Sequence, residues 1–199
     1  MRNLFVSAIF FVVSISLIMA QDPLFTRPIY KPYQEGKELY EKEQFSASRI
    51  AFETFLNQPL DRNDPYVVLA QYYRGMASLA LYHNDAILQL DQFNKNYPEN
   101  TFKNAISYAI ANYYFQQQDY ALATNYFQQT TPEQLDSSDL ESYYFKKGYG
   151  CYLLGLYDEA MPSFKNVKDS KSQYGNVSLY YYSHLAYLKS QWDIAKHGF

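Results

Sequence analysis

Tyr143–Val167 reads YYFKKGYGCYLLGLYDEAMPSFKNV and decides the fold of this 199-residue chain. Apolar residues recur at helical spacing on both sides of Gly155, which marks a tight turn. The small residues Gly148 and Ala160 stand where two helix backbones must approach, and Phe164 supplies bulk. The stretch therefore predicts two short amphipathic helices. Such a pair cannot bury its apolar face alone and implies neighbours of the same kind.

The pattern recurs along the whole chain. Small residues in register with Ala160 follow one another at spacings of 35 to 38 residues, at Ser48, Ala86, Ala123, Ala160 and Ala195. Four residues after each stands a bulky one: Phe52, Leu90, Phe127, Phe164 and Phe199. Three residues before each stands another: Phe45, His83, Tyr120, Tyr157 and Trp192. These offsets place the three positions on one helical stripe, so we expect His83 to be a packing residue of the core.

Another small-residue position lies twelve residues before each of these, at Gly36, Arg74, Ala111, Gly148 and Ser183. Arg74 departs from the pattern. Either the second unit is locally looser, or its small residue stands one place on, at Gly75. Helix start signals fall between the units, with Asp64 before Pro65 and the capping-box spacing of Ser138 and Glu141. The sequence predicts an all-α fold with two helices per unit.

These residues resemble the tetratricopeptide repeat family, whose repeat has 34 residues. The fourth unit carries the resemblance at Tyr144, Gly148, Cys151, Ala160 and Phe164, and the second carries it at Ala86, Leu90, Phe93 and Pro98. The resemblance implies a right-handed α-solenoid over residues 34–199. Five repeats are expected near 29–66, 67–103, 104–140, 141–175 and 176–199, the last incomplete. The chain is similar to the N-terminal part of long exported tetratricopeptide proteins of bacterial envelopes, and we expect further repeats beyond Phe199.

The N-terminal segment indicates export. Residues 1–20 have one early charge at Arg2, an apolar run and a small residue at Ala20, which is the layout of a secretory signal peptide. An uncleaved membrane anchor is the alternative and the only membrane contact that we expect. The proline-rich residues 21–33 are expected to be a linker. We expect a protein of the periplasm or outer envelope.

Composition excludes some functions. The formal net charge is −3 and no basic run occurs, which disfavours nucleic acid as a partner. Cys151 is the single cysteine, so no intrachain disulfide can form, and its simplest role is that of a small buried residue. The three histidines lack metal-ligand spacing, and no phosphate loop or activated serine motif is present. We therefore expect no metal, no cofactor and no catalytic residue.

The resemblance also implies where a partner binds, because the first helix of each repeat lines the concave groove in this family. The groove positions carried over from the family are Tyr108, Asn112 and Phe115 in the third repeat, Phe145, Tyr149 and Tyr152 in the fourth, and Tyr180, His184 and Tyr187 in the fifth. The first two repeats would add Tyr33, Lys37 and Tyr40, and Gln71, Gly75 and Ser78. Many of these rings can instead pack between neighbouring helices.

One family subtype clamps a terminal carboxylate with Lys, Asn and Arg. Asn112 falls on the Asn position, but Tyr108 replaces the Lys and no basic pair is expected nearby, so we expect no clamp. The sequence favours a non-enzymatic scaffold of the cell envelope that binds protein partners through an aromatic groove. The alternative is a carbohydrate-binding or uptake-associated helical module.

Overall fold

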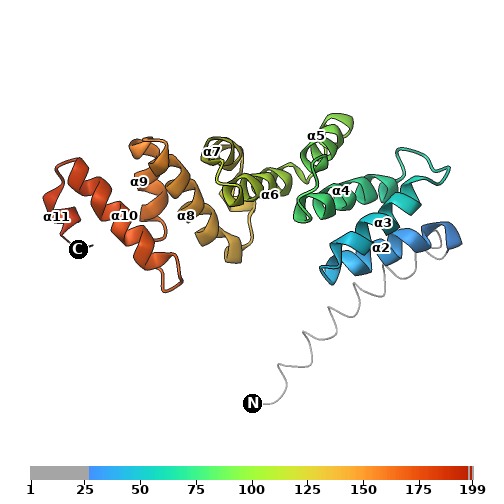
Figure 1. Ribbon diagram of the computed structural model, residues 1–199, viewed down its shortest axis with the longest axis horizontal. Helices are drawn as coiled ribbons and strands as arrows, with labels where there is room; N and C mark the ends of the chain where they lie inside the picture. Colours follow the sequence, from blue (N-terminus) through green and yellow to red (C-terminus); the bar gives the residue numbers. More distant parts are fainter. Residues whose placement is uncertain (1–26, 197, 199) are drawn as a thin grey trace, which may run out of the picture. The chain divides into compact units, whose positions relative to one another are not determined.

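The computed structural model describes residues 27–196 and Gly198, which form two compact units divided after Gln89. The first unit holds the 3-10 helix η1 (Pro28–Tyr30) and helices α2 (Lys31–Glu41), α3 (Phe45–Leu56) and α4 (Pro65–Ala80), and α5 (Ala86–Asn96) crosses into the second unit. The second unit continues with α6 (Lys103–Gln116), α7 (Tyr120–Gln128), η2 (Pro132–Gln134), α8 (Ser137–Leu153), α9 (Tyr157–Lys165), α10 (Gly175–Leu188) and α11 (Trp192–Ala195). The described residues contain no strand (Figure 1).

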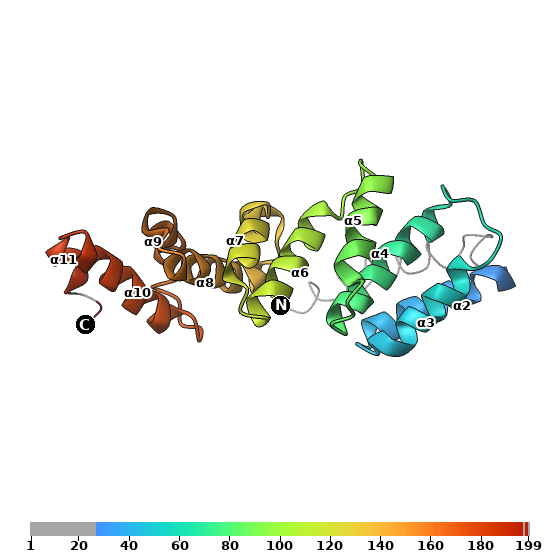
Figure 2. The ribbon, with the colours of Figure 1, turned by 45° about the horizontal axis from the view of Figure 1, so that its top comes forward.

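Within each unit, helices that follow one another in sequence pack side by side. In the first unit α3 contacts both α2 and α4, and in the second unit contacts run from α6 through α7, α8, α9 and α10 to α11. Figure 2 shows the same succession from a second direction. The predicted all-α architecture of consecutive helix pairs is confirmed. We call the first and second helix of each pair helix A and helix B.

The same kind of turn joins helix A to helix B in five places. Each turn has a single residue at positive φ, between 56° and 74°: Glu43, Tyr82, Gln118, Gly155 and Ser190. The next residue donates its backbone N–H to a carbonyl five residues earlier, at 2.8–3.0 Å, in the pairs Gln44 to Leu39, His83 to Ser78, Asp119 to Tyr114, Leu156 to Cys151 and Gln191 to Ala186. This is the Schellman ending of a helix, in which a left-handed residue closes the last turn. A shared turn geometry gives every pair the same local hairpin.

The small residues of the register lie in the helix contacts, as predicted. Ser48, Ala86, Ala123 and Ala160 are fully buried, and the bulky residues four positions on from each of them are also fully buried. Gly36 and Gly148 on helices A lie against the rings of Phe52 and Phe164 on helices B, where an added Cβ would come within 3.0 and 3.1 Å of the ring. Close approach of the two backbones thus requires the missing side chain.

The second pair resolves the exception at Arg74. Gly75 is buried, whereas Arg74 is only partly buried. The carbonyl that accepts the hydrogen bond of the turn, from the N–H of His83, is that of Ser78 rather than that of its neighbour Ala77. The residue at positive φ, Tyr82, lies four positions before Ala86, whereas the matching residue of each other pair lies five positions before its small residue. The turn is one residue shorter here, so the small residue of helix A stands one place on, at Gly75.

The residues three positions before the small one do not belong to the core. Tyr157 is 40 % exposed and Trp192 53 % exposed, and His83 is exposed in the turn before α5. The prediction that His83 packs in the core is therefore wrong. These positions open helix B, as at Phe45, or precede it, so the side chain lies at a helix end and is not fully enclosed.

Two further expectations are corrected at helix starts. Among the described residues, the first helical turn starts at Pro28, inside the stretch 21–33 expected as a linker, because Pro28 and Pro32 occupy first-turn positions that need no N–H donor. Residues 1–26, with the expected signal peptide, lie outside the described part.

Ser138 is already the second residue of α8, so it does not form the predicted capping box. Asp64 does cap α4, accepting from the N–H of Tyr66 at 2.8 Å.

Aromatic residues dominate the cores of both units. In the first unit Tyr30, Tyr33, Phe52 and Phe55 form one buried cluster with Val67 and Ala70. In the second unit one cluster gathers around Phe127 and Tyr143, and another around Phe164 and Leu185. Tyr143 is 1 % exposed, and its hydroxyl donates to the carbonyls of Phe127 and Thr130 at 3.1 and 3.3 Å. The Tyr143 hydroxyl therefore finds its partners at the end of α7 and just after it, which ties α8 to the preceding helix pair.

No helix among the described residues is long and apolar enough to cross a membrane.

Candidate functional site

The nine expected groove residues all lie on helices A of the second unit, and we call this surface the A-helix face. It consists of Tyr108, Asn112 and Phe115 on α6, Phe145, Tyr149 and Tyr152 on α8, and Tyr180, His184 and Tyr187 on α10. The helical spacing of three and four residues aligns each set along its helix. The sets differ in how far they are exposed.

On α6 the three residues are tied into the fold. Tyr108 and Phe115 are partly buried and pack on the cluster around Phe127. The Tyr108 hydroxyl lies 3.3 Å from Oδ1 of Asp139, and burial is the largest of the effects that raise its pKa above the ordinary value. The Asn112 amide donates to the carbonyl of Tyr108 at 3.0 Å. These residues can present only part of each side chain to a partner.

On α8 the rings lie between those of neighbouring helices. Tyr149 contacts four rings, those of Phe115, Tyr120, Phe145 and Tyr181, with centroids 5.5–6.1 Å apart. Tyr152 lies 4.8 Å from the ring of Tyr181, and its hydroxyl is 3.2 Å from Nδ1 of His184. The faces of these rings are largely used within the protein, which supports the packing interpretation for the middle of the face.

The α10 part of the face is open. Tyr180 is 49 % exposed and Tyr187 53 % exposed, and His184 is partly buried between α8 and its neighbour Tyr180, whose ring is stacked at 6.4 Å. Tyr187 meets the ring of Trp192 edge to face at 5.3 Å. A partner therefore finds its most accessible aromatic surface on α10.

Tyr181 joins the three helices, and the sequence reasoning missed it. Its ring contacts Tyr149 and Tyr152 on α8 and stacks on Phe164 of α9 at 5.2 Å. Together with the contact of Phe115 and Tyr149 at 6.1 Å, these rings form a continuous row from α6 to α10. The signal that could have found Tyr181 is its place directly beside the predicted Tyr180, on the side that turns to helix B.

Lys146 is a second residue that the sequence reasoning missed. Its ammonium donates to Oδ1 of Asn112 at 2.5 Å and lies 5.8 Å from the centroid of the Phe115 ring. Burial lowers its pKa, opposed by the charges of Tyr174 and Asp139, and no described carboxylate forms an ion pair with it. The sequence reasoning expected no basic pair near Asn112, and the structure places one lysine there, Lys146. Its neighbour Lys147 turns away and donates to the Tyr143 hydroxyl at 3.2 Å.

In the first unit the expected groove positions are mostly inaccessible. Tyr33 is 3 % exposed, and Gly75 and Ser78 are buried. Tyr40 packs on the core of that unit, and Lys37 pairs with Glu41 at 3.6 Å. The prediction that these positions offer a groove is wrong for Tyr33, Gly75 and Ser78, because all three are buried within the unit.

Cys151 has the environment of a structural residue and not of a reactive one. Cys151 is fully buried, and burial raises the pKa of its thiol to about 11, which suppresses the reactive thiolate near neutral pH. Among the described residues no three His, Cys, Asp or Glu side chains gather as a metal site would require.

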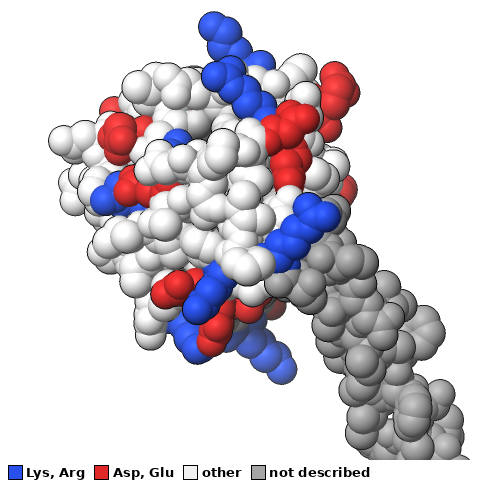
Figure 3. All heavy atoms as spheres, turned by 90° about the vertical axis from the view of Figure 1, so that its right-hand side faces the viewer, with Lys and Arg blue, Asp and Glu red and all other residues white. Residues whose placement is uncertain are grey.

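Charged side chains are mixed in sign. On the face shown in Figure 3, Lys and Arg side chains are interspersed with Asp and Glu around uncharged surface. The ion pairs join side chains that keep substantial exposure, such as Lys42 with Glu38 at 2.6 Å. No extended basic surface is present on that face for a phosphate backbone to contact.

Searches of protein-family models, of curated proteins and of solved structures find no significant match to this chain.

Proposed function

We propose that the chain is a non-enzymatic scaffold of the bacterial cell envelope that binds a protein partner on the A-helix face. We further infer that its helix pairs are repeats of the tetratricopeptide kind and stack as a right-handed solenoid. The five turns of shared geometry and the small residues of the register support this inference. The envelope location rests on the composition of residues 1–20.

The observation that carries the proposed function is the aromatic row from α6 to α10, which reaches the exposed ring of Tyr180 through Tyr181, with the exposed ring of Tyr187 further along α10. Tyrosine offers a large apolar surface together with a hydroxyl, at low cost in side-chain entropy, and is enriched where proteins meet. A helix or an extended segment with apolar anchors suits such a row. The Lys146 ammonium adds one positive group beside Asn112.

Sugar stacking is a weaker use of the same rings. To stack on a tyrosine, a pyranose needs a free face of that ring, and the rings of Tyr149 and Tyr152 are engaged by neighbouring aromatic rings. Only Tyr180 and Tyr187 retain large exposed areas. The A-helix face therefore favours a protein partner over a carbohydrate.

A photo-crosslinking experiment tests the proposal. A benzoylphenylalanine residue replaces Tyr187 in one variant and Ile50 in the other, since Ile50 is 56 % exposed on helix B α3 and serves as the matched control. In an envelope extract we expect a discrete protein adduct from position 187 and none from position 50. The adduct should be lost in Tyr180→Ser but kept in Leu88→Ser, an equally exposed apolar site on α5. Equal labelling at both positions, or retention of glycans by the unlabelled protein with loss in Tyr180→Ser, contradicts the proposal.

A further inference from the structure

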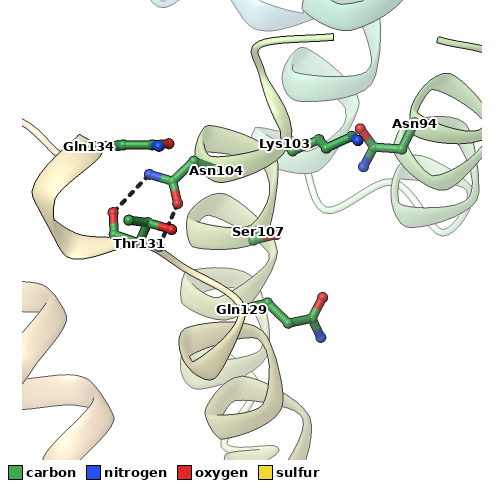
Figure 4. A pocket seen from close by; sticks show the side chains of 7 residues that line it. All are labelled: Asn94, Lys103, Asn104, Ser107, Gln129, Thr131 and Gln134. Atoms are coloured by element: carbon green, nitrogen blue, oxygen red, sulfur yellow. Dashed lines mark hydrogen bonds between the residues drawn. The ribbon is translucent and has the colours of Figure 1, made fainter. Parts of the chain in front are cut away.

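A polar pocket lies away from the A-helix face, where α5, α6, the end of α7 and η2 meet in the second unit. Seven side chains line it, and they come from Asn94, Lys103, Asn104, Ser107, Gln129, Thr131 and Gln134 (Figure 4). Its volume is about 340 Å³, at the lower end of the range for small-molecule sites. The lining contains four carboxamides, two hydroxyls and one ammonium, with no carboxylate and no apolar side chain.

One wall of the pocket is fixed by its own hydrogen bonds. The Asn104 amide bonds both main-chain groups of Thr131, accepting from its N–H at 2.6 Å and donating to its carbonyl at 3.1 Å. On the other side, Oδ1 of Asn94 accepts from the Asn100 amide at 3.0 Å. Figure 4 shows the Asn104 and Thr131 pair on one side of the hollow and Asn94 with Lys103 on the other. A fixed frame lowers the cost of ordering the site when a ligand binds.

The remaining polar groups are not engaged by the protein. The side chains of Lys103, Ser107, Gln129 and Gln134 make no hydrogen bond or ion pair with any described residue. Each carboxamide offers two donors and an acceptor, and the serine hydroxyl offers both roles. The pocket therefore presents donors and acceptors side by side.

This chemistry discriminates between classes of ligand. A cation is disfavoured, because an ammonium and no carboxylate lines the pocket. An anion would find only one exposed ammonium, and an apolar ligand or an anchored peptide side chain would find no apolar side chain to pack against. A neutral polyhydroxylated ligand matches, since its hydroxyls both donate and accept as the carboxamides do.

We propose that this pocket binds a neutral saccharide of one or two rings. The Gln129 and Gln134 carboxamides and the Ser107 hydroxyl contact its hydroxyls, and the wall formed by Asn104 and Thr131 orients it. The site is independent of the A-helix face and its protein partner. The proposal assigns carbohydrate recognition to the carboxamides of this pocket rather than to the tyrosine rings of the A-helix face.

The test is nuclear magnetic resonance titration of the side-chain amide and aromatic ring signals of the purified chain. The saccharide probes are glucose, galactose, N-acetylglucosamine, maltose and cellobiose, and the comparison probes are inorganic phosphate and a blocked trialanine peptide. We expect at least one saccharide to shift the Gln129 and Gln134 signals, but not those of Gln116 and Gln117, which are exposed at the turn after α6. The double variant Gln129→Ala with Gln134→Ala should weaken that binding by about tenfold or more, the loss expected for one or two neutral hydrogen bonds. The matched double variant Gln116→Ala with Gln117→Ala should bind as the unmodified chain does.

Three results overturn the proposal. The first is that none of the five saccharides shifts the Gln129 or Gln134 signals, or that saccharide shifts gather on Tyr180 and Tyr187 instead. The second is that phosphate binds more tightly than every saccharide and loses its binding in Lys103→Met, which makes this an anion site. The third is that only the peptide shifts the pocket signals. Far-ultraviolet circular dichroism of the exposed-site variants confirms that a loss of binding is not a loss of fold.

Discussion

Gly148 on α8 lies against the ring of Phe164 on α9, so closely that a methyl group on Gly148 would come within 3.1 Å of the ring. The same relationship joins Gly36 on α2 and Phe52 on α3. In both pairs a glycine on helix A meets a fully buried phenylalanine on helix B. The absence of a side chain sets how close the two helices come, and this spacing is the local unit from which each helix pair is built.

Gly148→Ala should destabilise the protein despite the better helix propensity of alanine. The propensity gain is at most ~1 kcal/mol, whereas overpacking a filled contact costs ~1–3 kcal/mol. Chemical denaturation measures the difference. The double variant with Phe164→Leu should recover part of the loss as a coupling energy of at least ~0.5 kcal/mol. Strict additivity of the two substitutions would show that the ring does not limit the approach.

Gly150→Ala should also destabilise, through a different neighbour. A Cβ here would come within 2.5 Å of Oγ1 of Thr124, a buried hydroxyl without a hydrogen-bond partner. We expect a loss of ~1–3 kcal/mol, and Thr124→Ala in the same chain should restore most of it because it removes the clashing atom. Urea unfolding of the two single variants and the double variant closes the cycle. A double variant no more stable than Gly150→Ala alone would rule out this contact as the cause.

Ala160→Leu should cost ~1–3 kcal/mol, because Ala160 is fully buried in the contact of α8 and α9. The matched control is Ala121→Leu, at an exposed position of α7, where the same substitution should change stability by less than ~0.5 kcal/mol. Thermal denaturation compares the two. An unchanged melting temperature for Ala160→Leu would mean that the repeat register is wrong.

Gln118→Gly should stabilise the protein by up to ~1 kcal/mol. Gln118 has φ of 61° in the turn after α6, a conformation that costs a side-chain-bearing residue free energy and that glycine adopts freely. The converse change, Gly155→Ala at φ of 74°, should cost ~1 kcal/mol although nothing lies within 4 Å of the added Cβ. Equilibrium unfolding of both variants tests the pair. A gain in stability for Gln118→Gly together with a loss for Gly155→Ala supports the conformational explanation, and changes in the same direction contradict it.

Alkaline pH should destabilise the fold. Burial is the largest cause of the raised pKa values of Tyr33 and Tyr72, and burial likewise raises the pKa of Cys151 to about 11. Groups with a raised folded-state pKa stabilise fully below their unfolded pKa, about 10 for tyrosine, and that stabilisation is lost as the pH rises above it. Lys146, whose pKa burial lowers, acts in the opposite direction but is a single group.

We therefore expect the free energy of unfolding to fall slightly between about pH 8 and pH 9.5, where the thiol of the unfolded chain ionises, and more steeply between about pH 9.5 and pH 11, where the tyrosines of the unfolded chain ionise. Denaturant titrations at these pH values measure it. Tyr33→Phe should show a smaller fall over the same interval. A free energy that stays level or rises up to pH 11 would contradict the assigned burial of the tyrosines.

The sequence by itself determined the helix pairs and their repetition. Helix periodicity and the spacing of Ser48, Ala86, Ala123 and Ala160 are local or strictly periodic properties, and all four residues are buried as predicted. The turn at Gly155 could also be predicted from the sequence, because only glycine adopts the left-handed conformation freely.

Only the tertiary structure decided which aromatic residues are core and which are surface. Tyr33 and Tyr180 occupy comparable expected groove positions, yet one is 3 % and the other 49 % exposed. The difference comes from residues on other helices, such as Phe52, Phe55 and Tyr66 around Tyr33, as does the contact between Lys146 and Asn112. A side chain's place along its own helix sets the direction in which it points, but the helices packed beside it decide whether that direction leads to solvent.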